Sequence, residues 1–162
     1  MIVVSDTSPL NYLVLIEHAQ VLPLLFGRVV APPAVIAELQ HPGAPAVVRV
    51  WAADPPAWLD IRPPARIDPS LGLGIGETQA ISLAHELHAD AVLIDERRAL
   101  TIARKAGLFV TGTLGVLEIA AEQGLIDLVQ AVVALKQTTF RVSEEVLDGV
   151  LQRDADRRRQ LN

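Results

Sequence analysis

The stretches IVVSD at residues 2–6 and AVLID at residues 91–95 share one pattern, a short apolar run with an aspartate directly behind it. Short runs rich in Val, Ile and Leu are typical of strands that are buried on both faces of a parallel sheet. The carboxyl ends of such strands meet at one edge, where open α/β sheets bind their ligands. We therefore expect Asp6 and Asp95 to lie together at a functional edge.

Strand and helix signals alternate along the chain around these two stretches. Strands are expected at residues 2–5, 28–31, 58–62, 91–94 and 108–110. Helices are expected at residues 9–16, 18–26, 33–40, 44–53, 77–87, 97–106, 113–123 and 125–135, with a surface loop at 63–76. This alternation predicts right-handed crossovers and a three-layer α/β/α sandwich with a central parallel sheet.

The whole chain, residues 1–162, is expected to form a single domain, because this length buries a sizeable core. The core spans about residues 1–135, and a C-terminal helix about residues 143–159. Ser143 is the expected N-cap of that helix, with two glutamates at its positive end. The arginines of this helix alternate with aspartates, so pairs on the helix surface explain them.

Composition excludes several classes of protein. The chain has no cysteine, which excludes disulfides and thiolate zinc sites. No apolar run approaches the roughly 20 residues of a membrane span, and the N-terminus does not resemble a signal peptide, so we expect a cytoplasmic protein. A net charge of −5 argues against a protein that coats nucleic acid nonspecifically. A bound cation would reverse the sign of the charge locally.

Two further acids, Glu38 in PPAVIAEL and Glu77 in GIGETQAISLA, are placed by the same topology at the end of the sheet that carries Asp6 and Asp95. Gathered carboxylates repel one another unless a cation or a proton intervenes. Mg²⁺ and Mn²⁺ prefer oxygen ligands. The four acids together therefore indicate a divalent-metal site and a phosphodiester hydrolase.

Each acid also has a purely structural interpretation. Asp6 is suited to a helix N-cap or an Asx turn, and Asp95 to capping the helix that follows it. Glu38 fits a solvated position on a short helix, and Glu77 gains from the dipole at a helix start. Glu96 is expected to point to solvent.

Five motifs in order resemble those of PIN-domain proteins, in particular the VapC-like branch of toxin ribonucleases. They are VVSDTSPLNYL, PPAVIAEL, the GxGE of LGLGIGET, LIDERRA and VTGTLGVL. The resemblance runs from about residue 1 to residue 135. It implies a compact α/β/α fold and a ribonuclease site that depends on Mg²⁺ or Mn²⁺.

The resemblance also implies roles for individual residues. Asp6, Glu38, Glu77 and Asp95 would be catalytic, and Asp6, Glu77 and Asp95 would hold the metal. Glu38 would orient the attacking water or help to hold a second ion. The hydroxyl groups of Ser8 and of Thr111 or Thr113 would hold a water or a phosphate.

The expected substrate is RNA. Arg97, Arg98, Arg104 and Lys105 follow Asp95 and are candidates to contact the RNA backbone, although a solvated basic helix face explains them equally well. The resemblance further implies a small antitoxin protein as inhibitor, and a homodimer. The leucines of residues 10–25 are numerous enough for part of them to serve such a contact, the alternative being a plain core.

The alternative function is a non-catalytic PIN-like module that binds RNA or protein. It is favoured by the acidic net charge and by Glu77, which stands where many PIN domains have aspartate. Other sites have little support. His85 and His88 do not form an HExxH zinc motif, and Gly72-x-Gly74-x-Gly76 is not a dinucleotide loop.

Overall fold

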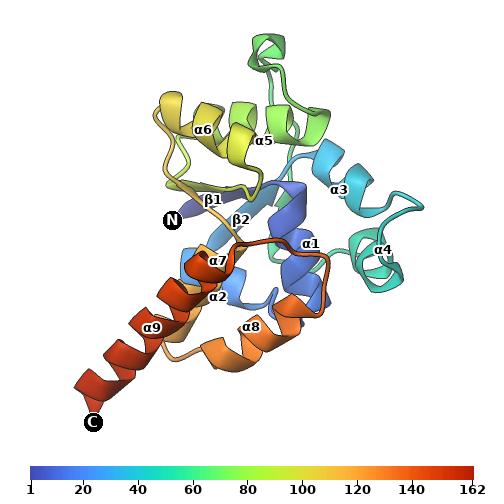
Figure 1. Cartoon of the computed structure of the whole chain (residues 1–162). Coiled ribbons are helices and arrows are strands. Elements are labelled where there is room, and N and C mark those ends of the chain that lie inside the picture. Colours follow the sequence, from blue (N-terminus) through green and yellow to red (C-terminus); the bar gives the residue numbers. More distant parts are fainter. The chain divides into compact units, whose positions relative to one another are not determined.

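The computed structural model describes residues 1–162 (Figure 1). The chain divides into two compact units, Met1–Thr113 and Leu114–Asn162. The first unit contains the sheet and all of the predicted site residues, and the second consists of helices.

The first unit is built on a five-stranded parallel sheet with strand order β3-β2-β1-β4-β5. The strands are β1 (Ile2–Ser5), β2 (Arg28–Ala31), β3 (Leu59–Ile61), β4 (Ala91–Leu93) and β5 (Val110–Thr111). In the register of the sheet, Val4 pairs with Val30 on one side and with Val92 on the other. The predicted α/β fold with a central parallel sheet is confirmed.

The order of the strands places a switch point at β1. The chain proceeds outward from β1 through β2 to β3, then returns to the other side of β1 with β4 and β5. The backbone N–H of Asp6 donates to the carbonyl oxygen of Leu93 at 3.0 Å, so the ends of β1 and β4 stay side by side. The crevice outside such a switch point is the usual ligand site of an open α/β sheet.

Helices cover both faces of the sheet (Figure 1). In this unit they are α1 (Thr7–Leu15), α2 (Val21–Phe26), α3 (Pro33–Leu39), α4 (Ala46–Ala53), α5 (Ile75–Glu86) and α6 (Arg97–Lys105), with a short 3₁₀ turn at Pro69–Leu71. Small and branched residues of α5 and α6 pack onto Val4, Val30, Val92 and Ile94 in one continuous core. Because side chains alternate along a strand, Val3, Val29 and Leu93 face the opposite side, where they are also fully buried.

The second unit contains most of α7 (Thr113–Glu122), with α8 (Leu128–Lys136) and α9 (Glu144–Leu161). The hydroxyl of Ser143 accepts from the N–H of Val146 at 3.2 Å, so the predicted cap and the predicted C-terminal helix are both present. Arg158 and Arg159 pair with aspartates one turn earlier on α9, as the alternating sequence predicts. No helix of the chain is long and apolar enough to cross a membrane.

Several helix boundaries differ from the sequence prediction, each for a local reason. The second helix begins at Val21 and not at His18, because Glu17 adopts a left-handed conformation with φ of 61°. Helix α8 begins at Leu128 and not at Leu125, because Asp127 caps it by accepting from the N–H of Gln130. Helix α5 begins two residues early, at Ile75, which places Glu77 within its first turn.

Candidate active site

Asp6 occupies the N-cap position of α1, but its side chain makes no capping hydrogen bond. The residue is 4% exposed, and its Oδ1 atom is buried without a hydrogen-bond partner. Leaving a buried polar atom unpaired costs free energy, and a buried carboxylate costs more than most. A capping role does not explain this arrangement, since the cap bond is missing.

The electrostatic surroundings of Asp6 oppose its ionisation. Burial is the largest cause, and it raises the pKa of Asp6 to about 7. The backbone N–H of Thr7 acts in the opposite direction, while the carboxylates of Glu77, Glu38 and Asp95 raise the pKa further. The fold thus brings Glu77, Glu38 and Asp95 within electrostatic reach of Asp6, which is the least exposed of the four acids.

Glu38 is held by donors from two other helices. The hydroxyl of Thr7, at the start of α1, donates to its Oε2 atom. The backbone N–H of Gly76, in the first turn of α5, donates to its Oε1 atom at 3.1 Å. Both oxygens are therefore fixed, and Glu38 is not the solvated residue that its position on a short helix allows.

Gly76 leaves room for the close approach of Glu38. A Cβ atom at this position would lie 2.6 Å from Oε1 and 2.7 Å from Oε2 of Glu38, so the carboxylate would have to leave its present position. Asp95 approaches Gly112 just as closely, because a Cβ there would lie 2.6 Å from its Oδ1. Two of the four carboxylates thus pack directly against backbone that has no side chain.

Asp95 is fixed by Thr113. Its Oδ1 accepts from the backbone N–H of Thr113 at 2.7 Å, and its Oδ2 accepts from the hydroxyl at 2.6 Å. Burial raises the pKa of Asp95, and the two bonds from Thr113 counteract that rise. Thr113 therefore orients an acid, which differs from the predicted role of holding a water or a phosphate itself.

Asp95 does not cap α6. That role belongs to Glu96, whose side chain accepts from the N–H groups of Arg98 and Ala99 at 3.0 and 2.8 Å. These bonds lower the pKa of Glu96. Glu96 is exposed, as predicted, and is engaged in capping, which leaves Asp95 as the acid directed at the strand edge.

Glu77 is only partly buried. That burial raises its pKa and Glu96 and Glu38 add to the rise, whereas a backbone hydrogen bond at Gly74 and the charge of Arg98 oppose it. The guanidinium of Arg98 also approaches the loop before α5, where a Cβ on Gly72 would lie 3.2 Å from Nη2. Arg98 therefore lies at the rim of the acidic cluster, beside Glu77.

The remaining predicted residues differ in their burial and in their position relative to the four acids. Ser8 is half-buried and lines a cavity that Glu38 also lines. Thr111 is half-buried at the end of β5, where its carbonyl oxygen accepts from the N–H of Ile94. Arg97 is exposed at the first residue of α6. Arg104 and Lys105 are in the last turn of α6, at the opposite end of this helix from Asp95.

Sequence reasoning missed three residues that organise the cluster, namely Thr7, Gly76 and Gly112. Thr7 directly follows Asp6, but only the tertiary structure brings it to Glu38. A glycine inside a helix is a signal, because it is unfavourable there unless something approaches closely. Gly76 gives that signal only once α5 is known to begin at Ile75, because with the expected start at Glu77 it falls in the preceding loop.

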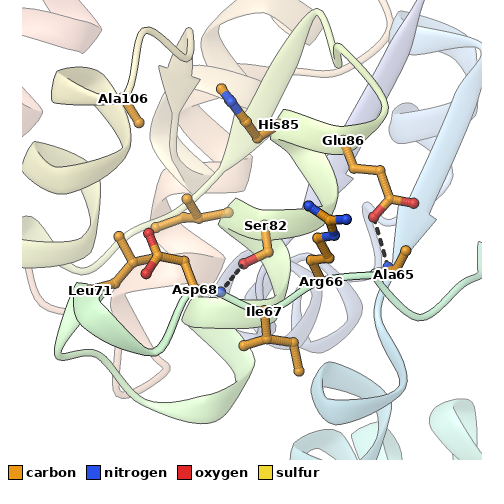
Figure 2. A pocket seen from close by; sticks show the side chains of 10 residues that line it. Ala65, Arg66, Ile67, Asp68, Leu71, Ser82, His85, Glu86 and Ala106 are labelled. Atoms are coloured by element: carbon orange, nitrogen blue, oxygen red, sulfur yellow. Dashed lines mark hydrogen bonds between the residues drawn. The ribbon is translucent and has the colours of Figure 1, made fainter.

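A larger cavity, of about 580 Å³, lies between the segment 65–71 and α5 (Figure 2). Two hydrogen bonds hold that segment on the helix, from the N–H of Ala65 to Glu86 and from the N–H of Asp68 to Ser82. Its lining is mainly apolar and includes none of the four acids. The four predicted acids are therefore grouped away from this cavity, at the strand ends.

Comparison with known proteins agrees with this geometry. The family model that matches the chain is that of a PIN-domain family, DUF3368, and it covers residues 2–156. The chain belongs to the PIN-domain family. A comparison with curated proteins finds no match.

A solved structure shares the PIN fold with this chain. It is a PilT N-terminus domain protein, SSO1118, from the hyperthermophilic archaeon Sulfolobus solfataricus P2. The TM-score is 0.50 at 16% sequence identity, with 75% of this chain and 95% of that chain covered. At this identity the likeness concerns the fold alone.

The donor set of this PIN domain fits a hard divalent cation. No three His, Asp or Glu side chains meet closely enough to form a complete protein cage for a metal ion. Mg²⁺ seldom needs such a cage, because it binds through one or two carboxylates together with waters and substrate phosphates. The unpaired Oδ1 of Asp6, beside three further carboxylates, provides oxygen donors of that kind.

We predict that Gly76→Ala destabilises the protein even though alanine favours helices. The new Cβ would displace Glu38, whereas an unhindered Gly→Ala change inside a helix gains about 1 kcal/mol. Gly149→Ala is the matched control, because its Cβ meets nothing closer than 3.5 Å on α9. Urea unfolding should show a loss for Gly76→Ala and a gain for Gly149→Ala. Equal gains would contradict the packing of Glu38 on Gly76.

We predict that ionisation of Asp6 destabilises the metal-free protein. Its pKa is about 7 in the fold and about 3.9 in an unfolded chain, so the folded state binds the proton more tightly. The stabilising contribution is complete below about pH 4 and is lost as the pH rises through 7. Between pH 4 and 8, Asp6→Asn should therefore gain stability relative to wild type, on the order of 4 kcal/mol.

The measurement is urea unfolding of both proteins in EDTA across this pH range. Asp148→Asn, an exposed change on α9, controls for the loss of one charge. A difference between wild type and Asp6→Asn that does not change with pH would show that Asp6 ionises normally.

Proposed function

We propose that this PIN domain is a metal-dependent endoribonuclease that hydrolyses RNA phosphodiester bonds. PIN domains are generally nucleases that use divalent metals, and the chain has the fold of that family. One observation carries the proposal for this chain. Asp6 is buried with an unpaired oxygen at the switch point, next to three other acids. A bound cation removes the cost of that arrangement, which otherwise only a proton relieves.

In this proposal each acid has a distinct part. Asp6, Glu77 and Asp95 hold the metal, which when bound supplies a water of lowered pKa and neutralises charge on the phosphate. Glu38 orients the attacking water, because Thr7 and the Gly76 amide hold its two oxygens in place. Thr113 keeps Asp95 aligned through two hydrogen bonds.

Residues around this cluster contact the RNA backbone in this proposal. Arg98, at the rim beside Glu77, is placed to meet a phosphate oxygen. Arg97, the first residue of α6, is exposed beside it in sequence, and Ser8 and Thr111 contribute half-buried hydroxyls. The net charge of −5 means that these local cations, together with the metal, have to provide the attraction for RNA.

We further propose that the chain acts as the toxin of a VapBC-type pair in the cytoplasm, as a homodimer inhibited by a small antitoxin. The order of its five motifs supports this assignment. Among the leucines of the N-terminal helices, Leu10, Leu13 and Leu22 are fully buried whereas Leu24 is 66% exposed. Leu24 is thus the most exposed leucine of this group, which supports a role for it in a partner contact.

The second candidate function is a non-catalytic module that binds RNA or protein through the same cleft. It is favoured by Glu77, whose side chain is longer than the aspartate found in many PIN domains. Metal dependence distinguishes the two functions, because a binding module retains its activity in EDTA.

We predict that the purified protein cleaves a mixed RNA pool with Mg²⁺ or Mn²⁺ and that EDTA abolishes cleavage. Asp6→Asn should reduce the rate by about 100-fold or more, since even residues that only support metal ligands are often worth 10- to 100-fold. The assay follows product formation on gels, with circular dichroism to establish that each variant is folded. Asp148→Asn serves as the control and should cleave at the rate of wild type.

The assay separates the candidates. Cleavage that persists in EDTA or in folded Asp6→Asn would contradict the assigned metal site. RNA binding without cleavage by wild type would favour the non-catalytic module.

A further inference from the structure

A cavity of about 320 Å³ opens beside Glu38, between the start of α1 and the segment that follows α3. Its polar lining is formed by Thr7, Ser8, Asn11, Glu38 and His41. Thr7 and Glu38 also belong to the acidic cluster, where the one donates to the other. A molecule in this cavity therefore lies directly against the proposed active site.

His41 presents a defined hydrogen-bonding group to its surroundings. The N–H of Gly43 donates to its Nδ1 atom at 2.9 Å, so Nδ1 is the acceptor and the ring proton resides on Nε2. Gly43 is suited to this contact, because a Cβ there would lie 3.1 Å from Nδ1. Backbone bonds from His41 to Glu38 and from Ala44 to His41 further fix the segment. The imidazole is thereby set as a donor at Nε2.

The size and charge of the cavity limit what it binds. Its volume is at the lower end of small-molecule sites, which span about 300–1,000 Å³, so it suits one compact group better than a helix or a chain segment. No lysine or arginine lines it, and Glu38 does, so an anionic phosphate is disfavoured. A neutral heterocycle with donors and acceptors on its edge matches Asn11, Ser8 and the donor of His41.

We propose that this cavity is a nucleoside subsite that receives one unpaired base of single-stranded RNA, next to the scissile phosphate. Sequence-specific RNA recognition commonly takes an unstacked base and reads its edge with hydrogen bonds. Asn11 and His41 determine which base is accepted, because their side chains carry directional donors that are independent of the metal. The catalytic role of the neighbouring acids rests on the proposed function, whereas binding of the base does not.

The test uses adenosine, guanosine, cytidine and uridine as probes, with the full chain in EDTA, monitored by NMR chemical shifts. At least one nucleoside should bind saturably, with a dissociation constant on the order of 1 mM, and shift the signals of residues 7–11 and 41. Asn11→Leu, which keeps the size of the side chain, and His41→Ala should each weaken binding by about 3- to 10-fold, as expected for one lost hydrogen bond.

His85→Ala is the matched control for loss of an imidazole, since His85 lines the larger cavity of Figure 2 and should leave nucleoside binding unchanged. The proposal is overturned if no nucleoside gives saturable shifts at these residues, or if the variants bind as wild type does. It is also overturned if N-acetylarginine amide binds there and nucleosides do not, because the cavity then accepts a basic side chain of a protein partner.

The cleavage pattern supplies a second readout. Sequencing the products from a random RNA pool should show a base preference at one position beside the cut, and Asn11→Leu should relax that preference. An unchanged preference would contradict the assignment of Asn11. If only the proposed function is wrong, the results differ from these. Wild type then binds nucleosides and the variants bind them more weakly, but wild type cleaves no RNA.

Discussion

The burial of the Asp6 carboxyl group is the constraint on which the rest of the site depends. The residue directly follows the central strand, and the bond from its N–H to Leu93 keeps it between two strand ends. Its Oδ1 has no partner, and three acids nearby raise the cost of its charge. A protein retains such an arrangement when a proton or a cation relieves it, and the family to which this chain belongs generally uses cations.

Hydrogen bonds hold two of the neighbouring carboxylates in fixed positions. Glu38 and Asp95 are each held through both oxygens, by Thr7 and Gly76 in one case and by Thr113 in the other. Groups positioned in advance do not have to reorganise when charge develops during a reaction. The glycines that allow this approach, Gly76 and Gly112, are as much a part of the site as the acids.

The sequence predicted the placement of Asp6 and Asp95 well, because residues that follow parallel strands are located by topology alone. The same topology placed Glu38 and Glu77 at that end of the sheet, but their individual roles depended on the family resemblance, since a position on a helix does not say what the side chain contacts. The partners of the acids were not predictable, because Thr7 and Glu38 are far apart in sequence and meet only through packing. The structural alternative for Asp95, a cap on α6, does not apply, because Glu96 is the residue that caps this helix.

The most direct test of this account is calorimetric titration of the protein with Mn²⁺, in buffers of different ionisation enthalpy, at about pH 6 and about pH 8.5. Because the pKa of Asp6 is about 7 without metal, binding should release close to one proton at the lower pH and almost none at the higher. Asp6→Asn should bind far more weakly at both. Equal proton release at the two pH values, or undiminished binding by Asp6→Asn, would contradict the claim that Asp6 is the centre of a cation site.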